Sequence, residues 1–568
     1  MTGAAIAPLD LAVIALTVVG VLIVGLLAGR GQTSAADYFL GKRNKPWWAV
    51  ACSQLATQAS DASFIGGAGL AYAYGVNAGI FNFTIGVFLP LVGLLLIPVL
   101  YRMGIVTLPS YFARRFDAKT RALKAVLFLF YRGGALGIYL YIPAVSLAAV
   151  YPLRLLGLSP LMTYLIVFAG VAGLYATWGG LSSVIWTDVV QYLVMLAGVA
   201  VLLPLTLGAV GGFDSLLQAL PAGHRDFFKW NADPASAAWP FWPLLLGGFI
   251  VQAGYFGAEQ TEVQRTLSAR SLRDARIACS AAAMMAGLEV VLWIIPGLAG
   301  SVLYPGLQSQ DQVLVTMMAA LIPTGLQGLF IAALIMAVMS SFESYLNSIS
   351  AVVITDVVQP LSQRLAGKQL SDRQWLRVSR YLTGVLLVVA VLMGPLTQAL
   401  GGVMIAINRI TSVAYGPILA GLLLGLFVAR VGGDGAFWGM LSGLLVAALV
   451  VFGEFIPAGW TAALPVALGS SLRSLFEVHW LYAGIIGFAI TVGVALAVEA
   501  TGAVRHGRKP AAVEPPSGGE GVWRHGLVRL LAIGDEGRPW FQSSAMLAML
   551  AILWNIAWAW AFQAWIFA

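Results

Sequence analysis

The chain alternates long apolar segments with short polar connections along most of its length. Each apolar segment has about 20 to 30 residues, enough for an α-helix to cross the hydrocarbon core of a bilayer. This pattern predicts an all-α polytopic membrane protein with about fourteen transmembrane helices. The predicted spans, numbered 1 to 14, are residues 9–29, 47–73, 79–103, 120–150, 159–178, 182–210, 241–263, 275–303, 326–358, 377–397, 401–428, 434–453, 481–500 and 543–566.

Polar residues interrupt span 2 near its middle, where Gln58, Ser60, Asp61 and Ser63 occur close together. An aspartate at the centre of a membrane helix costs about 2.5–3.5 kcal/mol even on permissive insertion scales. A helix that breaks near residues 56–62 would offset this cost, because an unwound turn frees backbone carbonyl groups for a cation. The alternative is an intact helix whose small polar residues pack against a neighbouring helix.

Span 7 contains a similar interruption. Residues 254–260 read GYFGAEQ and place two glycines and Glu259 inside an apolar helix. Spans 2 and 7 are five spans apart and run in opposite directions in the predicted topology. This arrangement is typical of two five-helix repeats of inverted topology, spans 2–6 and 7–11, with the binding site between them.

Basic residues indicate the orientation of the chain. Most of its 32 lysines and arginines lie in the loops after odd-numbered spans. The positive-inside rule assigns these loops to the cytoplasm, so both termini are predicted on the outer side, with a bacterial inner membrane as the expected location. Arg132 and Arg409 remain within spans 4 and 11. We expect Arg132 to snorkel, to pair with an acid or to have a functional role, while Arg409, beside Asn408, is a candidate for a solute site.

Composition narrows the function. The 568 residues are 60% hydrophobic and 10% charged, so no soluble domain of ordinary size is expected, and the net charge of +8 indicates topology rather than nucleic-acid binding. Two cysteines and four scattered histidines predict neither a disulfide framework nor a metal cluster. The sequence also contains no clustered nucleophile and base, so an enzyme is not expected.

The same patterns divide the chain into five parts. We expect a peripheral span and loop at 1–46, the transport core at 47–430, two peripheral spans at 431–500, a cytoplasmic linker with an amphipathic surface segment at 501–540, and a last span at 541–568.

Span 9 carries a stripe of small residues on one helical face: Ala337, Ser340, Ser341, Ser344 and Ser348. Such a stripe either allows close helix packing or supplies hydroxyl oxygens to a hard cation. The neighbouring Glu343 favours the second use, since packing needs no carboxylate. Span 6 carries Asp188 about two turns from its cytoplasmic end, where it is either a partner for Arg132 or an exit step for a cation.

Several of these motifs together resemble the sodium/solute symporter family, which transports sugars, proline, monocarboxylates and related solutes and has a LeuT-like fold. The motifs are DYFLGKR at 37–43, FIG at 64–66, GGL at 179–181 with WTD at 186–188, QRTLSARSL at 264–272, and MSS at 339–341 with LNS at 346–348. The resemblance covers about residues 10 to 500 and implies sodium as the coupling ion, with no other cofactor.

The resemblance also implies ion sites. The main sodium site would use the backbone carbonyl groups of Ala56, Ala59 and Ala337 and the hydroxyl groups of Ser340 and Ser341. A second sodium site, found in some members, is implied at Asp188 with Ser340 and Ser344. Glu343 stands where a small polar residue often occurs, so it either adds charge to the second site or alters it.

The implied solute site lies among spans 2, 3, 7 and 11, at Ser63, Phe81, Asn82, Glu259 and Asn408, with Gln58, Asp61 and Arg409 close by. These are not the polar residues that sugar-transporting members use, so sugar transport is not implied. The charges suit a zwitterionic or amine-bearing solute, with a small monocarboxylate as the alternative.

The expected mechanism is alternating access, in which sodium enters from outside and leaves past Asp188. Two alternatives remain open. One is a proton-coupled carrier of the same fold, in which Asp61, Asp188, Glu259 or Glu343 titrates. The other is a transporter-like membrane sensor, although the linker at 501–540 is too short for a soluble output domain.

Overall fold

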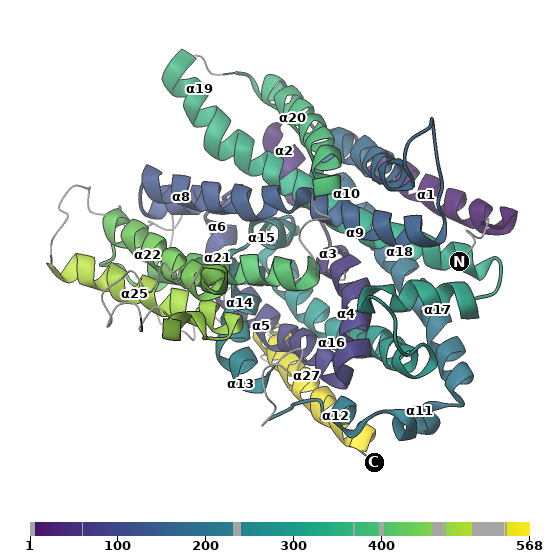
Figure 1. The fold of residues 1–568 in the computed structure, drawn as a ribbon. Helices are drawn as coiled ribbons and strands as arrows, with labels where there is room; N and C mark the ends of the chain where they lie inside the picture. Colours follow the sequence, from purple (N-terminus) through teal and green to yellow (C-terminus); the bar gives the residue numbers. More distant parts are fainter. Residues whose placement is uncertain are drawn as a thin grey trace.

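A computed structural model describes residues 6–58, 61–230, 240–366, 370–396, 403–456, 470, 473–501, 535, 539 and 542–567. All regular elements in these ranges are helices (Figure 1). The helices of the predicted transport core are α3 (Trp47–Gln58), α4 (Asp61–Tyr74), α5 (Ile80–Leu95), α6 (Ile97–Arg102), α8 (Ala118–Phe128), α9 (Leu136–Val150), α10 (Pro160–Val210), α14 (Phe249–Ala258), α15 (Gln260–Thr266), α16 (Leu272–Leu303), α18 (Leu326–Val352), α20 (Asp372–Met393) and α21 (Val403–Phe427).

Further helices lie around this core or connect its members. They are α1 (Pro8–Ala28), α2 (Ala35–Leu40), α7 (Leu108–Arg115), α11 (Phe213–Ala219), α12 (Ala222–Arg225), α13 (Phe241–Pro243), α17 (Val313–Leu321), α19 (Gln359–Ala366), α22 (Gly433–Phe452), α25 (Ala483–Thr501) and α27 (Ser544–Phe567). In Figure 1, α22 and α25 lie together on one side of the core, and α27 lies against α5 and α16. The predicted linker at 501–540 lies almost entirely outside the described residues, and the division into five parts stays a prediction.

Both predicted discontinuities coincide with helix ends. Helix α3 ends at Gln58 and α4 begins at Asp61. In span 7, Glu259 has an extended backbone with φ −93° and ψ 133°, which separates α14 from α15. Each of these spans therefore consists of two half-helices that meet inside the molecule.

The described chain contains 12 helical stretches long and apolar enough to cross a membrane. Two of these stretches each take in parts of two predicted spans. Helix α10 joins spans 5 and 6 across a kink, and the stretch from Gly66 to Leu95 joins the end of α4 to α5 through a short 3-10 turn at 75–79. Within α10, Gly180 has φ 53° and ψ −150°, so the helical path is interrupted there. A side chain at this position would collide with the backbone of Tyr38, which explains the requirement for glycine. The number of fourteen spans stays a prediction.

Two structural features position the site. Helix α18 is buried almost continuously from Phe330 to Val352 and packs closely against α10. The second feature connects the two broken spans at one end. The backbone N–H of Lys45 donates to Ser268 O at 3.1 Å and that of Arg270 donates to Lys45 O at 2.9 Å, joining the segment before α3 to the segment after α15.

Candidate functional site

The serine stripe of α18 meets the last turn of α3. The hydroxyl group of Ser340 donates to Ala56 O at 2.8 Å, and that of Ser341 donates to Thr57 O at 3.2 Å. Ala337 O also lies close, 3.0 Å from Ser340 Oγ. The structure thus brings together Ala56, Ala337, Ser340 and Ser341, four members of the predicted main sodium site. The fifth, Ala59, lies outside the described residues.

The surroundings of this cluster suit a small hard cation. All four residues are fully buried. The last carbonyl groups of a helix have no partner within the helix and carry the negative end of its dipole, so the C-terminal turn of α3 attracts positive charge. Carbonyl and hydroxyl oxygens on facing half-helices are the ligands that broken membrane helices offer to sodium.

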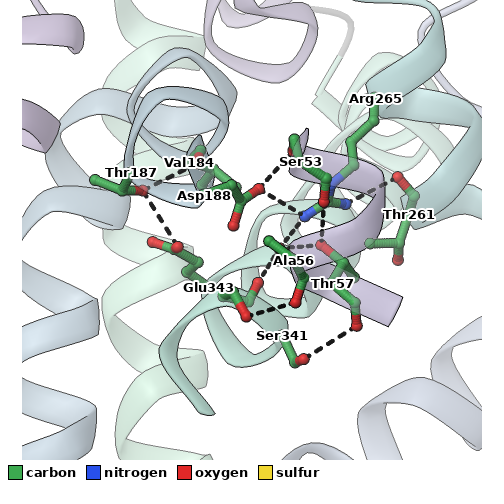
Figure 2. Close-up of polar contacts among 12 residues, drawn as sticks. Ser53, Ala56, Thr57, Val184, Thr187, Asp188, Thr261, Arg265, Ser341 and Glu343 are labelled. Carbon is green, nitrogen blue, oxygen red and sulfur yellow. Dashed lines mark hydrogen bonds and ion pairs between the residues drawn. The ribbon is translucent and has the colours of Figure 1, made fainter. Parts of the chain in front are cut away.

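A buried ion pair lies beside this cluster (Figure 2). Oδ2 of Asp188 accepts a hydrogen bond from Ser53 Oγ at 2.5 Å and lies 3.4 Å from Nη2 of Arg265. The Arg265 guanidinium also donates to Ser53 Oγ at 2.9 Å, to Thr261 O at 3.1 Å and to Ser344 Oγ. These contacts join α3, α10, α15 and α18 through one arginine.

This pair corrects two expectations. Asp188 does not pair with Arg132, because its partner is Arg265. Arg265, counted from the sequence among the basic residues of a cytoplasmic loop, is fully buried. The half-helix α15 has 7 residues and is therefore only about 10 Å long, so Arg265 still lies inside the molecule. Arg265 follows Thr261 by four residues and so lies on the same helical face. This spacing is the sequence signal that could have indicated that Arg265 is buried.

Glu343 is also fully buried and faces α10. Its Oε1 lies 3.2 Å from the hydroxyl oxygen of Thr187, the residue before Asp188. Ser344, which follows Glu343, receives a hydrogen bond from Arg265. Asp188 and Ser344, predicted for the second sodium site or the ion exit, therefore lie together with Glu343, which was expected to add charge to that site or to alter it.

A second buried ion pair lies at the break of span 7. Arg132 Nε lies 3.1 Å from Oε1 of Glu259, and both side chains are almost completely buried. Of the alternatives for Arg132, pairing with an acid is confirmed. Oε2 of Glu259 accepts the backbone N–H groups of Thr261 and Glu262, at 2.7 Å and 3.1 Å, so this carboxylate caps α15.

Tyrosines enclose the Arg132 guanidinium. The hydroxyl groups of Tyr139 and Tyr415 accept from Nη1 and Nη2 at 2.7 Å and 2.8 Å, and the ring of Tyr345 lies 4.4 Å from its Cζ. Sequence reasoning did not identify these tyrosines. The sequence could have indicated Tyr139, because this residue follows Arg132 by seven positions and so lies on the same helical face. Tyr345 and Tyr415 come from distant spans and carry no local signal.

The remaining residues predicted for the solute site lie around these clusters. Gln58 ends α3 and is half-buried, as are Phe81 and Asn82 at the start of α5 and Asn408 and Arg409 on α21. Gln252 of α14 donates to Phe81 O at 3.2 Å. Asp61 and Ser63 lie in the first turn of α4, and their side chains lie outside the described part of the structure.

Known proteins resemble this chain over most of its length. The sodium/glucose cotransporter 1 of Ovis aries is 28% identical over 86% of this chain and 78% of its own. The sodium/myo-inositol cotransporter 2 of Oryctolagus cuniculus is 30% identical over 85% of this chain and 75% of its own. The sodium/glucose cotransporter of Vibrio parahaemolyticus is 29% identical over 79% of this chain and 86% of its own.

A solved structure shares the fold. The substrate-bound, outward-open structure of a Na⁺-coupled sialic acid symporter superposes with a TM-score of 0.75 at 23% identity, covering 87% of this chain and 98% of its own. The fold is therefore that of a LeuT-like transporter. The model of the sodium:solute symporter family matches residues 38–443. With its broken helices, serine stripe and this match, the chain belongs to the sodium:solute symporter family.

Proposed function

We propose that this protein carries a small organic solute into the cell by sodium-coupled symport. The observation that supports the proposal most directly is the contact of Ser340 and Ser341 with the carbonyl groups of Ala56 and Thr57. These oxygens lie at the break of a membrane helix, where the same lone pairs are available to a sodium ion. The orientation, with both termini on the outer side of a bacterial inner membrane, is part of the proposal.

Sodium acts in this mechanism as a link between two helices. An ion that enters from outside attracts the C-terminal turn of α3 and the hydroxyl groups of α18 to a common point, which favours an outward-open form able to bind solute. Rocking of the repeats then opens the cytoplasmic side, and sodium leaves past Asp188. One sodium ion that crosses 100 mV supplies about 2.3 kcal/mol, enough for roughly fifty-fold solute accumulation.

Charge arguments favour an amine-bearing or zwitterionic solute. The N-terminus of a half-helix attracts an anion, and in many transporters it binds a carboxylate of the substrate. Here Glu259 of the protein itself caps α15 and is paired with Arg132. The other inner half-helix, α4, begins with the acid Asp61. A solute with an amine complements Asp61, whereas a monocarboxylate, the alternative, finds the start of α15 already occupied.

Thermal stability of the purified full-length protein tests this proposal, because a ligand that binds the folded state raises its melting temperature. The panel contains a zwitterionic amino acid, a quaternary amine, a small monocarboxylate and a neutral sugar, each in sodium and in potassium at equal ionic strength. We expect stabilisation that needs both sodium and the amine-bearing class. Stabilisation by a solute that is equal in both salts would contradict sodium coupling and support the proton-coupled carrier or the sensor.

A further inference from the structure

An apolar cavity of about 250 Å³ lies between α5, the segment that joins α13 to α14, and α27. The loop before α13 adds Phe227 and Phe228 to its lining, and α27 adds Ala559. In Figure 1, α5, α13 and α27 come together in this region. Because these elements are far apart in the sequence, the cavity is a feature of the folded protein and not of one helix surface.

The wall of the cavity does not suit a polar ligand. Its polar side chains are those of Thr84 and Asn555. The Thr84 hydroxyl donates to Phe81 O in its own helix at 2.5 Å, and the Asn555 amide nitrogen donates to Ala283 O at 3.0 Å. The amide oxygen of Asn555 lies against Gly287, so this side chain is directed at α16. A buried water needs about two to four polar partners, whereas an apolar cavity stays dry and takes up an apolar molecule.

The cavity opens toward the outside of the molecule. Three of its lining side chains, those of Leu245, Phe249 and Ile556, are 42%, 38% and 45% exposed. All three are apolar and belong to helical stretches long and apolar enough to cross a membrane. The mouth of the cavity therefore faces the hydrocarbon of the bilayer, where lipid acyl chains take the place of solvent.

Tryptophans place this mouth near the lipid headgroups. Trp230, Trp242 and Trp560 are 43%, 53% and 58% exposed. Their rings lie 5.1–5.2 Å from the rings of the lining residues Phe228 and Phe241. Exposed tryptophans gather at the boundary between bilayer and water. In the proposed orientation, the start of α5, the start of α13 and the end of α27 all lie on the outer side, so the cavity lies in the outer leaflet.

The loop that contributes Phe227 and Phe228 also carries positive charge. Arg225 and Lys229 lie on either side of these two phenylalanines, and Asp226 is the one acid between them. Residues 225–229 therefore have a net charge of +1 beside the lining of the cavity. Basic residues at this depth attract the phosphate groups of lipids.

We propose that this cavity binds one acyl chain of an outer-leaflet phospholipid, with the phosphate group beside Arg225 and Lys229. Lipid chains are as apolar as the lining, so the stabilisation comes from the van der Waals contacts that an empty cavity would lose. The bound chain fills the space between the last span and the core helices α5 and α14. This inference goes beyond the proposed transport function, because it requires neither sodium nor solute.

Photo-crosslinking of the full-length protein in vesicles tests the proposal. The vesicles contain equal amounts of phosphatidylethanolamine and phosphatidylglycerol, with a small fraction of phosphatidylglycerol that carries a diazirine in one acyl chain. After irradiation, mass spectrometry locates the labelled residues. We expect the label to concentrate on residues 80–88 and 241–249. In Ala559→Trp, whose indole occupies the cavity, the yield at these residues should fall about tenfold.

Ala557→Trp is the matched control. Ala557 lies two residues before Ala559 on α27, but its side chain is exposed and is not part of the cavity lining, so this variant keeps the wild-type yield. Val87→Phe is a second test variant, because it narrows the cavity from α5 and should lower the yield about threefold. A diacylglycerol with the same labelled chain lacks the phosphate and should label the cavity about threefold less than the phospholipid.

Equal labelling of residues 80–88 and 241–249 in the wild type and in Ala559→Trp overturns the site. If Ala559→Trp does not fold, a wild-type yield in Val87→Phe overturns it instead. Equal labelling by the diacylglycerol overturns the role of the phosphate group. A dimer that Ala559→Trp dissociates assigns the cavity to a second copy of the chain and overturns the lipid as its occupant. Sodium coupling is tested separately by the thermal-stability panel.

Discussion

Nε of Arg132 lies 3.1 Å from Oε1 of Glu259, in a contact between residues 127 positions apart in the chain. It connects span 4 with the break of span 7. The two partners are not equivalent. Glu259 receives three further hydrogen bonds from Thr261 and Glu262 at the start of α15, whereas the Arg132 guanidinium forms an ion pair with no other carboxylate among the residues that the structure describes.

This asymmetry predicts different costs for the two single substitutions. Glu259→Gln leaves a buried arginine without its counter-charge and is expected to lower stability by about 3–5 kcal/mol. Arg132→Gln is expected to cost less, because the start of α15 still stabilises Glu259. The double variant should recover part of the loss. Chemical unfolding of the three variants measures this, and equal losses that add in the double variant would contradict it.

Removal of one ligand from the main site should weaken sodium binding selectively. For Ser341→Ala, the sodium concentration that gives half-maximal stabilisation is expected to rise about tenfold, as for the loss of one favourable polar contact. Stability in potassium should change little. Ser348→Ala removes a buried hydroxyl of the same stripe two turns away and is the control. Unchanged sodium dependence in Ser341→Ala would count against the assignment.

The pair of Asp188 and Arg265 combines a structural and a transport role. Asp188→Asn leaves Arg265 without its carboxylate partner and should lower stability by about 3–5 kcal/mol. Arg265→Gln in the same molecule removes the unpaired charge and should restore much of that stability. Turnover is expected to stay slow in both variants, with solute binding less affected, if sodium leaves past Asp188. Wild-type turnover in the restored double variant would leave Asp188 a structural role only.

Lys45, in the loop before α3, predicts a dependence of stability on pH. Burial, with a further contribution from the charge of Lys42, lowers the pKa of Lys45 from 10.5 to about 8. Between these values the unfolded chain binds a proton that the folded protein does not, so stability rises with pH from about 8 to about 10.5. Lys45→Met should remove this rise. The melting temperature measured across this pH range tests the prediction, with Arg30→Met as a control. An unchanged rise in Lys45→Met would contradict it.

Much of the core was predictable because local patterns define it. The polar residues around Gln58 and the glycines before Glu259 mark the two helix breaks, and the spacing of Ser340 and Ser341 places both on the face that meets α3. These features depend on residues that are close in sequence. The order of these motifs along the chain was enough to predict the fold of the family.

Other features of the fold and the site depend on contacts between residues far apart in the sequence, so local patterns could not predict them. The sequence around Arg265 reads as the start of a basic loop, and only the short length of α15 places it inside the molecule. The choice of partner for Arg132 depends on the approach of span 7 to span 4. The kink at Gly180 lies between predicted spans 5 and 6, but its close contact with Tyr38 joins segments far apart in the sequence and could not be predicted.

The backbone hydrogen bonds between Lys45 and the segment from Ser268 to Arg270 have a mechanical consequence. Helix α3 runs from this junction into the molecule, toward the carbonyl group of Ala56. Helix α15 begins after Glu259 inside the molecule and runs back to the same junction. The two half-helices are therefore joined at this junction, with the turn of the proposed sodium site at the end of one and the residue that caps α15, predicted for the solute site, at the end of the other. Over the 12 residues of α3, about 18 Å at 1.5 Å per residue, a tilt of ten degrees displaces the inner end of α3 by about 3 Å. In the proposed mechanism, a tilt of α3 caused by sodium is thus passed to α15 through this junction.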